Sequence, residues 1–210
     1  KPLPNLDYKI VQGNSLIGMP ENAMRDHAAD DKLKKLKNKF FSETNNKEKT
    51  KLRNEINVTI RKLLDSAEEF AGYHIGFDFK LFFNEVFTEK GGFDVVIGNP
   101  PYVEARKLEQ IDVDYFRNHY TTAGNRVNTF AIFSEKGANL LSNGSVLTYI
   151  IHRNAIRSND YNKLRKFILD NTSILNILSF KIGVFENVTG EMTVLIIKKT
   201  KAKENHKIKI

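Results

Sequence analysis

Residues 93–102 read Phe-Asp-Val-Val-Ile-Gly-Asn-Pro-Pro-Tyr, and this stretch decides how the rest of the chain is interpreted. The apolar run 93–97 predicts a buried strand, which Gly98 and two prolines end. A residue before proline is kept out of the helical region, so Asn99 and Pro100 are both expected to be extended. Proline has no N–H, so the backbone at Pro100 and Pro101 can only accept hydrogen bonds. The loop is therefore stiff and rich in acceptors.

This loop suits a planar group that carries an NH2. The Asn99 amide oxygen adds a side-chain acceptor to the backbone acceptors, and Tyr102 offers an aromatic face. Two acceptors would hold both hydrogens of an adenine amine and direct its lone pair at an electrophile. Stacking on Tyr102, worth roughly 1–3 kcal/mol per base, can help to offset the few kcal/mol needed to flip a base out of a duplex. The alternative is a Pro-Pro turn that merely ends a strand.

The segments around this loop alternate between strands and helices. Tyr8–Val11 is strand-like, and two helices are expected between about Glu21 and Ala71, with a polar break at 42–48. After the loop we expect a helix at 128–141 ended by Asn143-Gly144, a strand at 145–151, a helix capped by Ser158, and strands at 174–180 and 192–197. This order predicts an α/β fold with a mostly parallel, doubly wound sheet. Sites in such sheets lie at carboxyl ends of strands, where 13–15 and 98–102 stand out.

The charge of the chain is uneven. The 210 residues include 33 Lys/Arg and 25 Asp/Glu, a net charge of +8. Residues 30–62 carry +6 and residues 198–210 carry +5, which leaves −3 for the remainder. A nucleic-acid partner and two solvated lysine-rich faces both fit this pattern.

Several classes of protein are excluded by composition. There is no cysteine, hence no disulfide framework and no cysteine zinc site. The apolar runs are far shorter than the roughly 20 residues of a membrane helix, and no signal peptide is evident, so we expect a cytoplasmic protein without a membrane partner.

Residues 93–102 closely resemble the signature of S-adenosylmethionine-dependent amino-methyltransferases. More narrowly, the chain resembles bacterial DNA N6-adenine methyltransferases of type IIG-like restriction–modification enzymes. The resemblance implies a partial Rossmann-like methyltransferase fold, S-adenosyl-L-methionine as cofactor and double-stranded DNA as partner. It also implies a catalytic core formed by residues 1–20 and 72–197, a basic helical insertion at 21–71, and a basic tail or the start of a next domain at 198–210.

The resemblance assigns roles within the loop. Asn99 and Pro100 would hold the adenine amine, Pro101 completes the catalytic motif, and Tyr102 would stack on the base. Phe185 sits where the family places a second aromatic contact to the base, although packing in the core is the alternative. No metal or general base is needed, because the amine can lose its proton after transfer.

Two asparagines outside the loop are also implied. Asn14 stands where the family usually has an Asp that accepts from the cofactor's adenine amine, and Asn99 would also border the cofactor. Asn128 precedes a helix that lines the site in the family, and an ordinary helix cap is the alternative. His152 stands where relatives often carry a proline, and it could touch DNA or simply end a strand.

One family motif is absent from these 210 residues. No Phe-x-Gly-x-Gly cofactor loop occurs, and the chain opens at Lys1 without an initiator Met. We therefore expect a fragment that is inactive alone, with the cofactor loop upstream and a target-recognition domain downstream in the parent chain.

Two other functions remain open. Methyltransferases of glutamine side chains or ribosomal RNA use similar loops, and a catalytically silent binding fragment is the third possibility. From Asn14 to Asn99 there are 85 positions that include a basic helical segment. This spacing favours the restriction-type DNA enzymes, which are less compact than the glutamine and RNA enzymes.

Overall fold

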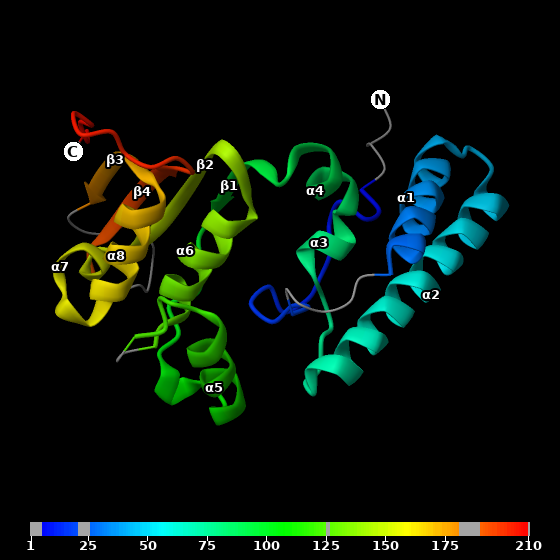
Figure 1. The fold of residues 1–210 in the computed structure, drawn as a ribbon, viewed down its shortest axis with the longest axis horizontal. Coiled ribbons are helices and arrows are strands. Elements are labelled where there is room, and N and C mark those ends of the chain that lie inside the picture. Colours follow the sequence, from blue (N-terminus) through cyan, green and yellow to red (C-terminus); the bar gives the residue numbers. More distant parts are fainter. Residues whose placement is uncertain (1–5, 21–25, 125–126, 181–189, 210) are drawn as a thin grey trace. The chain divides into compact units, whose positions relative to one another are not determined.

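The computed structural model describes residues 6–20, 26–124, 127–180 and 190–209. The chain forms two compact units, residues 1–89 and residues 90–210, coloured from blue to green and from green to red in Figure 1. The predicted division, in which 1–20 joins 72–197 in one core, stays a prediction. No helix in the described ranges is long and apolar enough to cross a membrane.

The second unit is built on one four-stranded sheet. Its strands are β1 (Phe93–Gly98), β2 (Leu141–His152), β3 (Ser173–Phe180) and β4 (Met192–Lys198), in the order β1-β2-β4-β3. β1 and β2 are parallel, whereas β4 runs antiparallel to both of its neighbours. The α/β class is confirmed. The expected mostly parallel pairing is wrong for these strands. β1, β2 and β3 run in the same direction, but β4 runs the other way between β2 and β3. Only the β1–β2 pair is therefore parallel.

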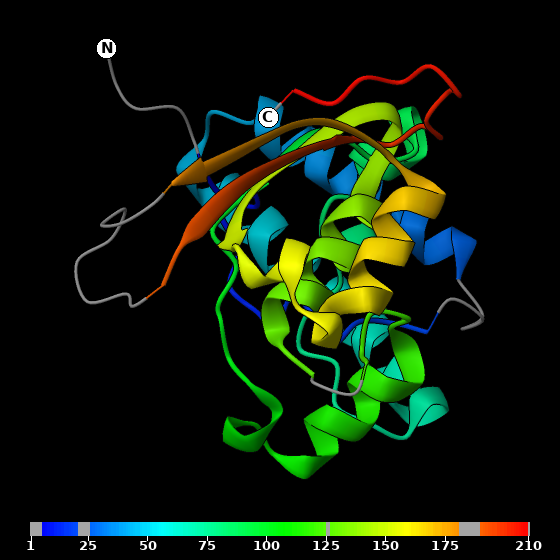
Figure 2. The same cartoon turned by 90° about the vertical axis from the view of Figure 1, so that its left-hand side faces the viewer.

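Three helices pack on one face of this sheet. They are α6 (Thr129–Leu140), α7 (Asn154–Arg157) and α8 (Asn162–Asn171), and Figure 2 shows α6 and α8 side by side along the strands. The core between the layers includes Phe130 of α6, Leu147 and Ile151 of β2, and Leu164 of α8, all at most 1% exposed. Alternate residues of β2 face these helices, as a strand period of two requires. The helix before β2 and the strands at 174–180 and 192–197 are confirmed.

Short helices join these elements. Ser158 caps the 3-10 turn η2 (Asn159–Tyr161), which leads into α8. The turn η1 (Ala105–Lys107) and α5 (Gln110–His119) lie between β1 and α6.

The first unit is helical throughout its regular structure. α1 (His27–Ser42) and α2 (Asn46–Ala71) form the expected hairpin, and α3 (Phe79–Phe82) and α4 (Asn84–Lys90) follow. The last residue of α4 falls just beyond the unit boundary. Asp26 caps α1 and Asn45 caps α2 through their side chains. Leu33 and Phe40 of α1 pack against Ile56 of α2, each 0% exposed.

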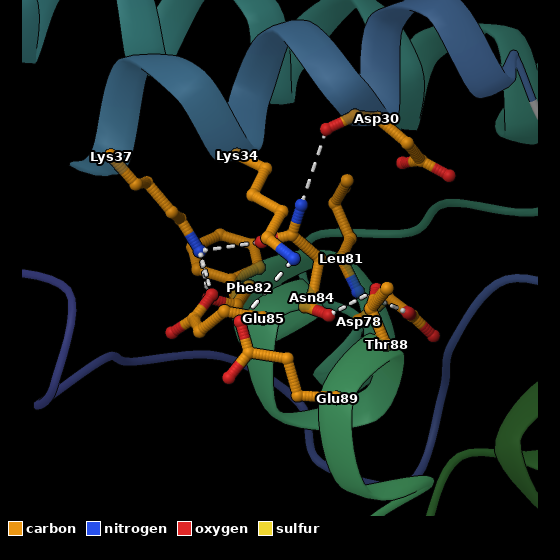
Figure 3. Close-up of polar contacts among 10 residues, drawn as sticks. All are labelled: Asp30, Lys34, Lys37, Asp78, Leu81, Phe82, Asn84, Glu85, Thr88 and Glu89. Atoms are coloured by element: carbon orange, nitrogen blue, oxygen red, sulfur yellow. Dashed lines mark hydrogen bonds and ion pairs between the residues drawn. The ribbon is translucent and has the colours of Figure 1, made fainter. Parts of the chain in front are cut away.

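A lysine of α1 is buried against the α3–α4 segment (Figure 3). The Lys37 side chain is 2% exposed. Its Nζ donates to the Phe82 carbonyl, and lies 3.4 Å from Asn84 Oδ1 and 3.2 Å from Glu85 Oε2. Burial lowers the pKa of Lys37, and the Glu85 carboxylate acts in the opposite direction. The ammonium group is thus desolvated but fully supplied with acceptors.

A second lysine of α1 reaches the same helix. Lys34 Nζ lies 3.3 Å from Glu89 Oε1 of α4 (Figure 3). Residues 32–39 contain five lysines, and two of them therefore bind carboxylates of α4. Lys32, Lys35 and Lys39 are exposed. The positive charge of this segment is smaller at its surface than the sequence suggests.

Three local predictions are wrong. Tyr8–Val11 forms a turn rather than a strand, with Tyr8 at a φ of 59°. The Tyr8 ring instead packs edge-on at 5.3 Å from that of Phe40, and its hydroxyl lies 3.0 Å from Asn57 Oδ1. Packing on the α1–α2 hairpin has overridden the local strand preference.

The other two wrong predictions concern the strands β1 and β2. Val95 and Ile97 are not buried but 61% and 78% exposed, because they point to the opposite face of the sheet from Val96, which packs against the core. Gly144 does not cap α6, which ends at Leu140. It lies within β2 at a φ of 83°, where the register slips from Phe93–Leu141 to Val95–Val146. The positive φ serves an irregularity of the strand.

The C-terminal tail runs beside the opposite edge of the sheet. Lys209 forms an isolated parallel bridge with Asn176 of β3, and His206 Nε2 lies 2.6 Å from the Ile174 carbonyl oxygen. The lysine-rich segment is thus attached to β3 over its last described residues.

Candidate functional site

The loop at residues 99–102 lies at the carboxyl end of β1, as expected for a site in such a sheet. Asn99 is exposed and Pro100 is buried. Gly98 just before the loop lies against the Tyr149 ring of β2, since a Cβ at this position would be 3.1 Å from Tyr149 Cε1. The loop therefore exposes the Asn99 amide to solvent, while Gly98 just before it is closely packed against β2.

Tyr102 is tied back to the sheet rather than projecting freely. Its hydroxyl lies 2.7 Å from Asn99 Oδ1 and 2.8 Å from the Ile150 carbonyl oxygen of β2. One phenolic proton cannot fully serve two acceptors, so the two contacts share it. Burial raises the pKa of Tyr102 to about 12, so the hydroxyl remains a donor well into the alkaline range. The ring packs against the core, 6.1 Å from the centroid of Phe130.

Thr129 holds the loop from the start of α6. Its hydroxyl lies 2.5 Å from the Pro101 carbonyl oxygen and 3.0 Å from Val103 N, and its backbone N–H donates to the Val103 carbonyl at 2.9 Å. Sequence reasoning missed this residue. No local signal marks it, because the contact joins residues 28 positions apart.

Asn128 acts as the cap of α6. Its side chain is buried, at 5% exposure, and Oδ1 accepts the Phe130 N–H at 3.3 Å. It lies in the same short segment as Thr129 and forms a bridge with Glu104 beyond the loop. The helix-cap role is present, and a contact between Asn128 and a target base stays a prediction.

His152 occupies the carboxyl end of β2. Its Nδ1 accepts the Asn154 N–H at 3.1 Å, and a Cβ on Gly190 would come within 2.5 Å of its Nε2. Both contacts fit the role of a residue that ends a strand. A contact with DNA is untested.

The predicted cofactor residue Asn14 belongs to the first unit. Its Oδ1 accepts the Leu16 N–H at 3.0 Å, and the side chain is exposed. An amide oxygen has two lone pairs, so this atom retains capacity to accept from the amine of S-adenosylmethionine. The residue present thus fits the predicted role, which stays untested. Phe185 lies outside the described residues.

A large cavity lies elsewhere. It has a volume of about 910 Å³, lies in the first unit beside α1 and α2, and has acidic side chains such as Asp26, Glu55 and Glu69 in its lining. None of the predicted site residues lines it. The described residues also contain no cluster of three or more His, Asp or Glu side chains suited to a metal.

Comparison with known proteins identifies relatives. The model of the Eco57I restriction-modification methylase family matches residues 11–185. The type II restriction enzyme and methyltransferase RM.Eco57I of Escherichia coli is 30% identical over 118 residues, which is 54% of this chain and 11% of that protein. The type II methyltransferase M.BstVI of Geobacillus stearothermophilus is 34% identical over 120 residues, 56% of this chain and 21% of that protein.

Solved structures with similar parts include a proposed class I S-adenosylmethionine-dependent methyltransferase from Listeria monocytogenes and the type IIG restriction endonuclease BpuSI. The first has a TM-score of 0.46 and 19% identity, covering 57% of this chain and 37% of that one. The second has a TM-score of 0.43 and 22% identity, covering 53% and 14%. The chain thus spans less than a quarter of the length of the two curated relatives it matches.

Proposed function

The chain belongs to the Eco57I restriction-modification methylase family, and from this premise we propose that the intact protein methylates N6 of adenine in a specific sequence of double-stranded DNA. The observation that carries the proposal is the exposed Asn99 amide on a loop that is fastened to both β2 and α6. A rigid acceptor at the carboxyl end of a strand is the group that a poorly nucleophilic amine requires.

The residues of the loop have separate tasks in this proposal. The Asn99 amide oxygen and the Pro100 carbonyl accept the two amine hydrogens and orient the nitrogen lone pair. Tyr102 provides the face on which the flipped base stacks. S-adenosylmethionine, when bound, supplies an electrophilic methyl group. The methylated nitrogen then releases its extra proton to water, so the chain needs no general base.

Replacing Asn99 tests this assignment in the intact protein. We expect Asn99→Ala to abolish transfer of methyl groups to duplex DNA, because one of the two acceptors for the amine is lost. The melting temperature should remain near that of the wild type, since Asn99 is exposed and Tyr102 keeps its hydrogen bond to the Ile150 carbonyl. Methylation at the wild-type rate by this variant would overturn the mechanism. Transfer to a glutamine side chain or to RNA, but not to DNA, would favour the other substrate classes.

We also propose that the edge of β1 pairs with a further strand of the parent chain. β1 is the terminal strand of the described sheet, so its outer backbone groups are not paired within that sheet, and an edge strand that also exposes Val95 and Ile97 is unusual in isolated proteins. The 210 residues also carry no Phe-x-Gly-x-Gly loop. Calorimetry should therefore show much weaker binding of S-adenosylmethionine to residues 1–210 than to the intact protein. Equal affinity would contradict the expectation for the cofactor, and hydrogen exchange of the β1 amides that is as fast in the intact protein as in residues 1–210 would contradict the pairing.

A further inference from the structure

Thr129 makes three hydrogen bonds to Pro101 and Val103. Its side-chain hydroxyl can donate one bond and accept others, so it donates to the Pro101 carbonyl and accepts the Val103 N–H. Its own N–H donates to the Val103 carbonyl. Thr129 is only 5% exposed, so water competes little for these groups.

The loop has few other means of fixing its backbone. Pro100 and Pro101 supply no N–H, so a hydrogen bond to their backbone has to come from a donor elsewhere in the chain. The Thr129 hydroxyl is such a donor for Pro101. Just beyond, Ala105 N–H donates to the Val127 carbonyl at 2.9 Å, so the exit of the loop is attached to residues 127–129 as a short antiparallel pair.

Tyr102 fastens the same loop from the other side through Ile150 of β2. The Thr129 contacts at Pro101 and Val103 flank Tyr102 in the chain. The position of the stacking ring relative to Asn99 therefore depends on attachments to two separate elements, β2 and α6.

We infer that Thr129 is a positioning residue for methyl transfer, which sets the Asn99–Tyr102 loop in its working geometry without touching the base. This inference rests on the function proposed above. Both functions of its hydroxyl are required, because a hydroxyl that only donated would leave the Val103 N–H unpaired. Serine preserves both functions, whereas valine preserves the shape of threonine and removes both.

The intact protein should be compared as wild type, Thr129→Val and Thr129→Ser. Small displacements of reacting groups can cost about 100-fold in rate, so Thr129→Val is expected to lower kcat for DNA methylation by about 10- to 100-fold. KM for DNA should change by less than about threefold, because the stacking face remains. Thr129→Ser should keep kcat within about threefold of wild type.

Ser134→Ala is the matched control. Ser134 is also a buried hydroxyl of α6, at 1% exposure, but it donates to the Phe130 carbonyl of its own helix at 2.8 Å. A general loss of helix stability would lower kcat equally in Ser134→Ala and Thr129→Val. Equal kcat values in these two variants, or in Thr129→Val and Thr129→Ser, would overturn the inference.

Hydrogen exchange separates this inference from the proposed function. The Val103 amide should exchange faster in Thr129→Val than in Ser134→Ala, whatever the substrate of the enzyme proves to be. Unchanged protection of Val103 would overturn the positioning role even if DNA is methylated. If wild-type protein methylates no DNA adenine while Val103 loses protection in Thr129→Val, the proposed function fails and the attachment of the loop by Thr129 stands.

Discussion

Lys37 in the first unit and Thr129 in the second hold a backbone carbonyl in different ways. Lys37 presents an ammonium group to the Phe82 carbonyl and needs Glu85 beside it. Thr129 presents a neutral hydroxyl to the Pro101 carbonyl and needs no counter-charge. Both side chains are at most 5% exposed.

The two contacts differ in the free energy needed to bury the donor group and in the charge that the donor brings. A buried charge loses its hydration, so its contact is stable only while its partner remains. A neutral hydroxyl costs less to bury and adds no net charge. Charge is therefore used between α1 and α4, where it serves packing, whereas the contact beside the Asn-Pro-Pro-Tyr loop is neutral.

Among variants that test this comparison, Glu85→Ala is expected to cause the largest loss of unfolding free energy. Glu85→Ala leaves the Lys37 ammonium buried without its counter-charge, and removal of one partner of a buried pair costs about 3–5 kcal/mol. Because the Glu85 side chain is 34% exposed, we expect a smaller cost of about 2–3 kcal/mol, which lies below that range. Urea unfolding followed by the circular dichroism of the helices measures it.

Lys37→Met is the matched variant. It keeps an unbranched chain and removes the charge, and such replacements are often neutral, so we expect a change within about 1 kcal/mol. In the double variant the Glu85→Ala cost should largely vanish. If Lys37→Met were as destabilising as Glu85→Ala, the Lys37 bonds would be stabilising in their own right and the comparison would fail.

The smallest effect is a difference in pH dependence. Burial lowers the Lys37 pKa below 10.5, so the unfolded chain binds this proton more tightly and stability from this site rises as pH approaches 10.5. Burial raises the Tyr102 pKa from 10.0 to about 12. The folded chain then holds the phenolic proton more tightly, and stability from this site is lost between pH 10 and 12.

The difference in unfolding free energy between wild type and a variant should therefore change with pH in opposite directions at the two sites. Wild type should gain stability relative to Lys37→Met as pH rises toward 10.5, and lose stability relative to Tyr102→Phe above pH 10. Slopes of the same sign for both differences would show that one of the two sites is not buried as described.

The sequence predicted the elements whose patterns are local. The α1–α2 hairpin follows from apolar residues at helical spacing on either side of a polar break, and β3 and β4 follow from apolar runs. Exposure and pairing direction depend on neighbours. The apolar run of β1 predicts a strand but not that Val95 and Ile97 are exposed, and nothing in β4 alone predicts that it enters between β2 and β3.

The candidate site divides in the same way. The stiffness and the acceptors of the loop follow from Asn99 and the two prolines, whose backbone limits are intrinsic. The attachments do not, because Tyr102 reaches Ile150 across 48 positions and Thr129 reaches Pro101 across 28. A lysine-rich surface on α1 was expected, but only the tertiary structure shows that Lys37 points inward.

The place of the C-terminal tail limits its influence on chemistry. Lys207 and Lys209 lie beside β3, and the order β1-β2-β4-β3 puts them four strand spacings from β1, or roughly 19 Å at about 4.8 Å per spacing. The Debye length at physiological ionic strength is about 8 Å. Salt would thus screen most of the electric field of these lysines before it reached an amine held by Asn99. Ionic strength should therefore change the association of the protein with a polyanion rather than the nucleophilicity of the bound base.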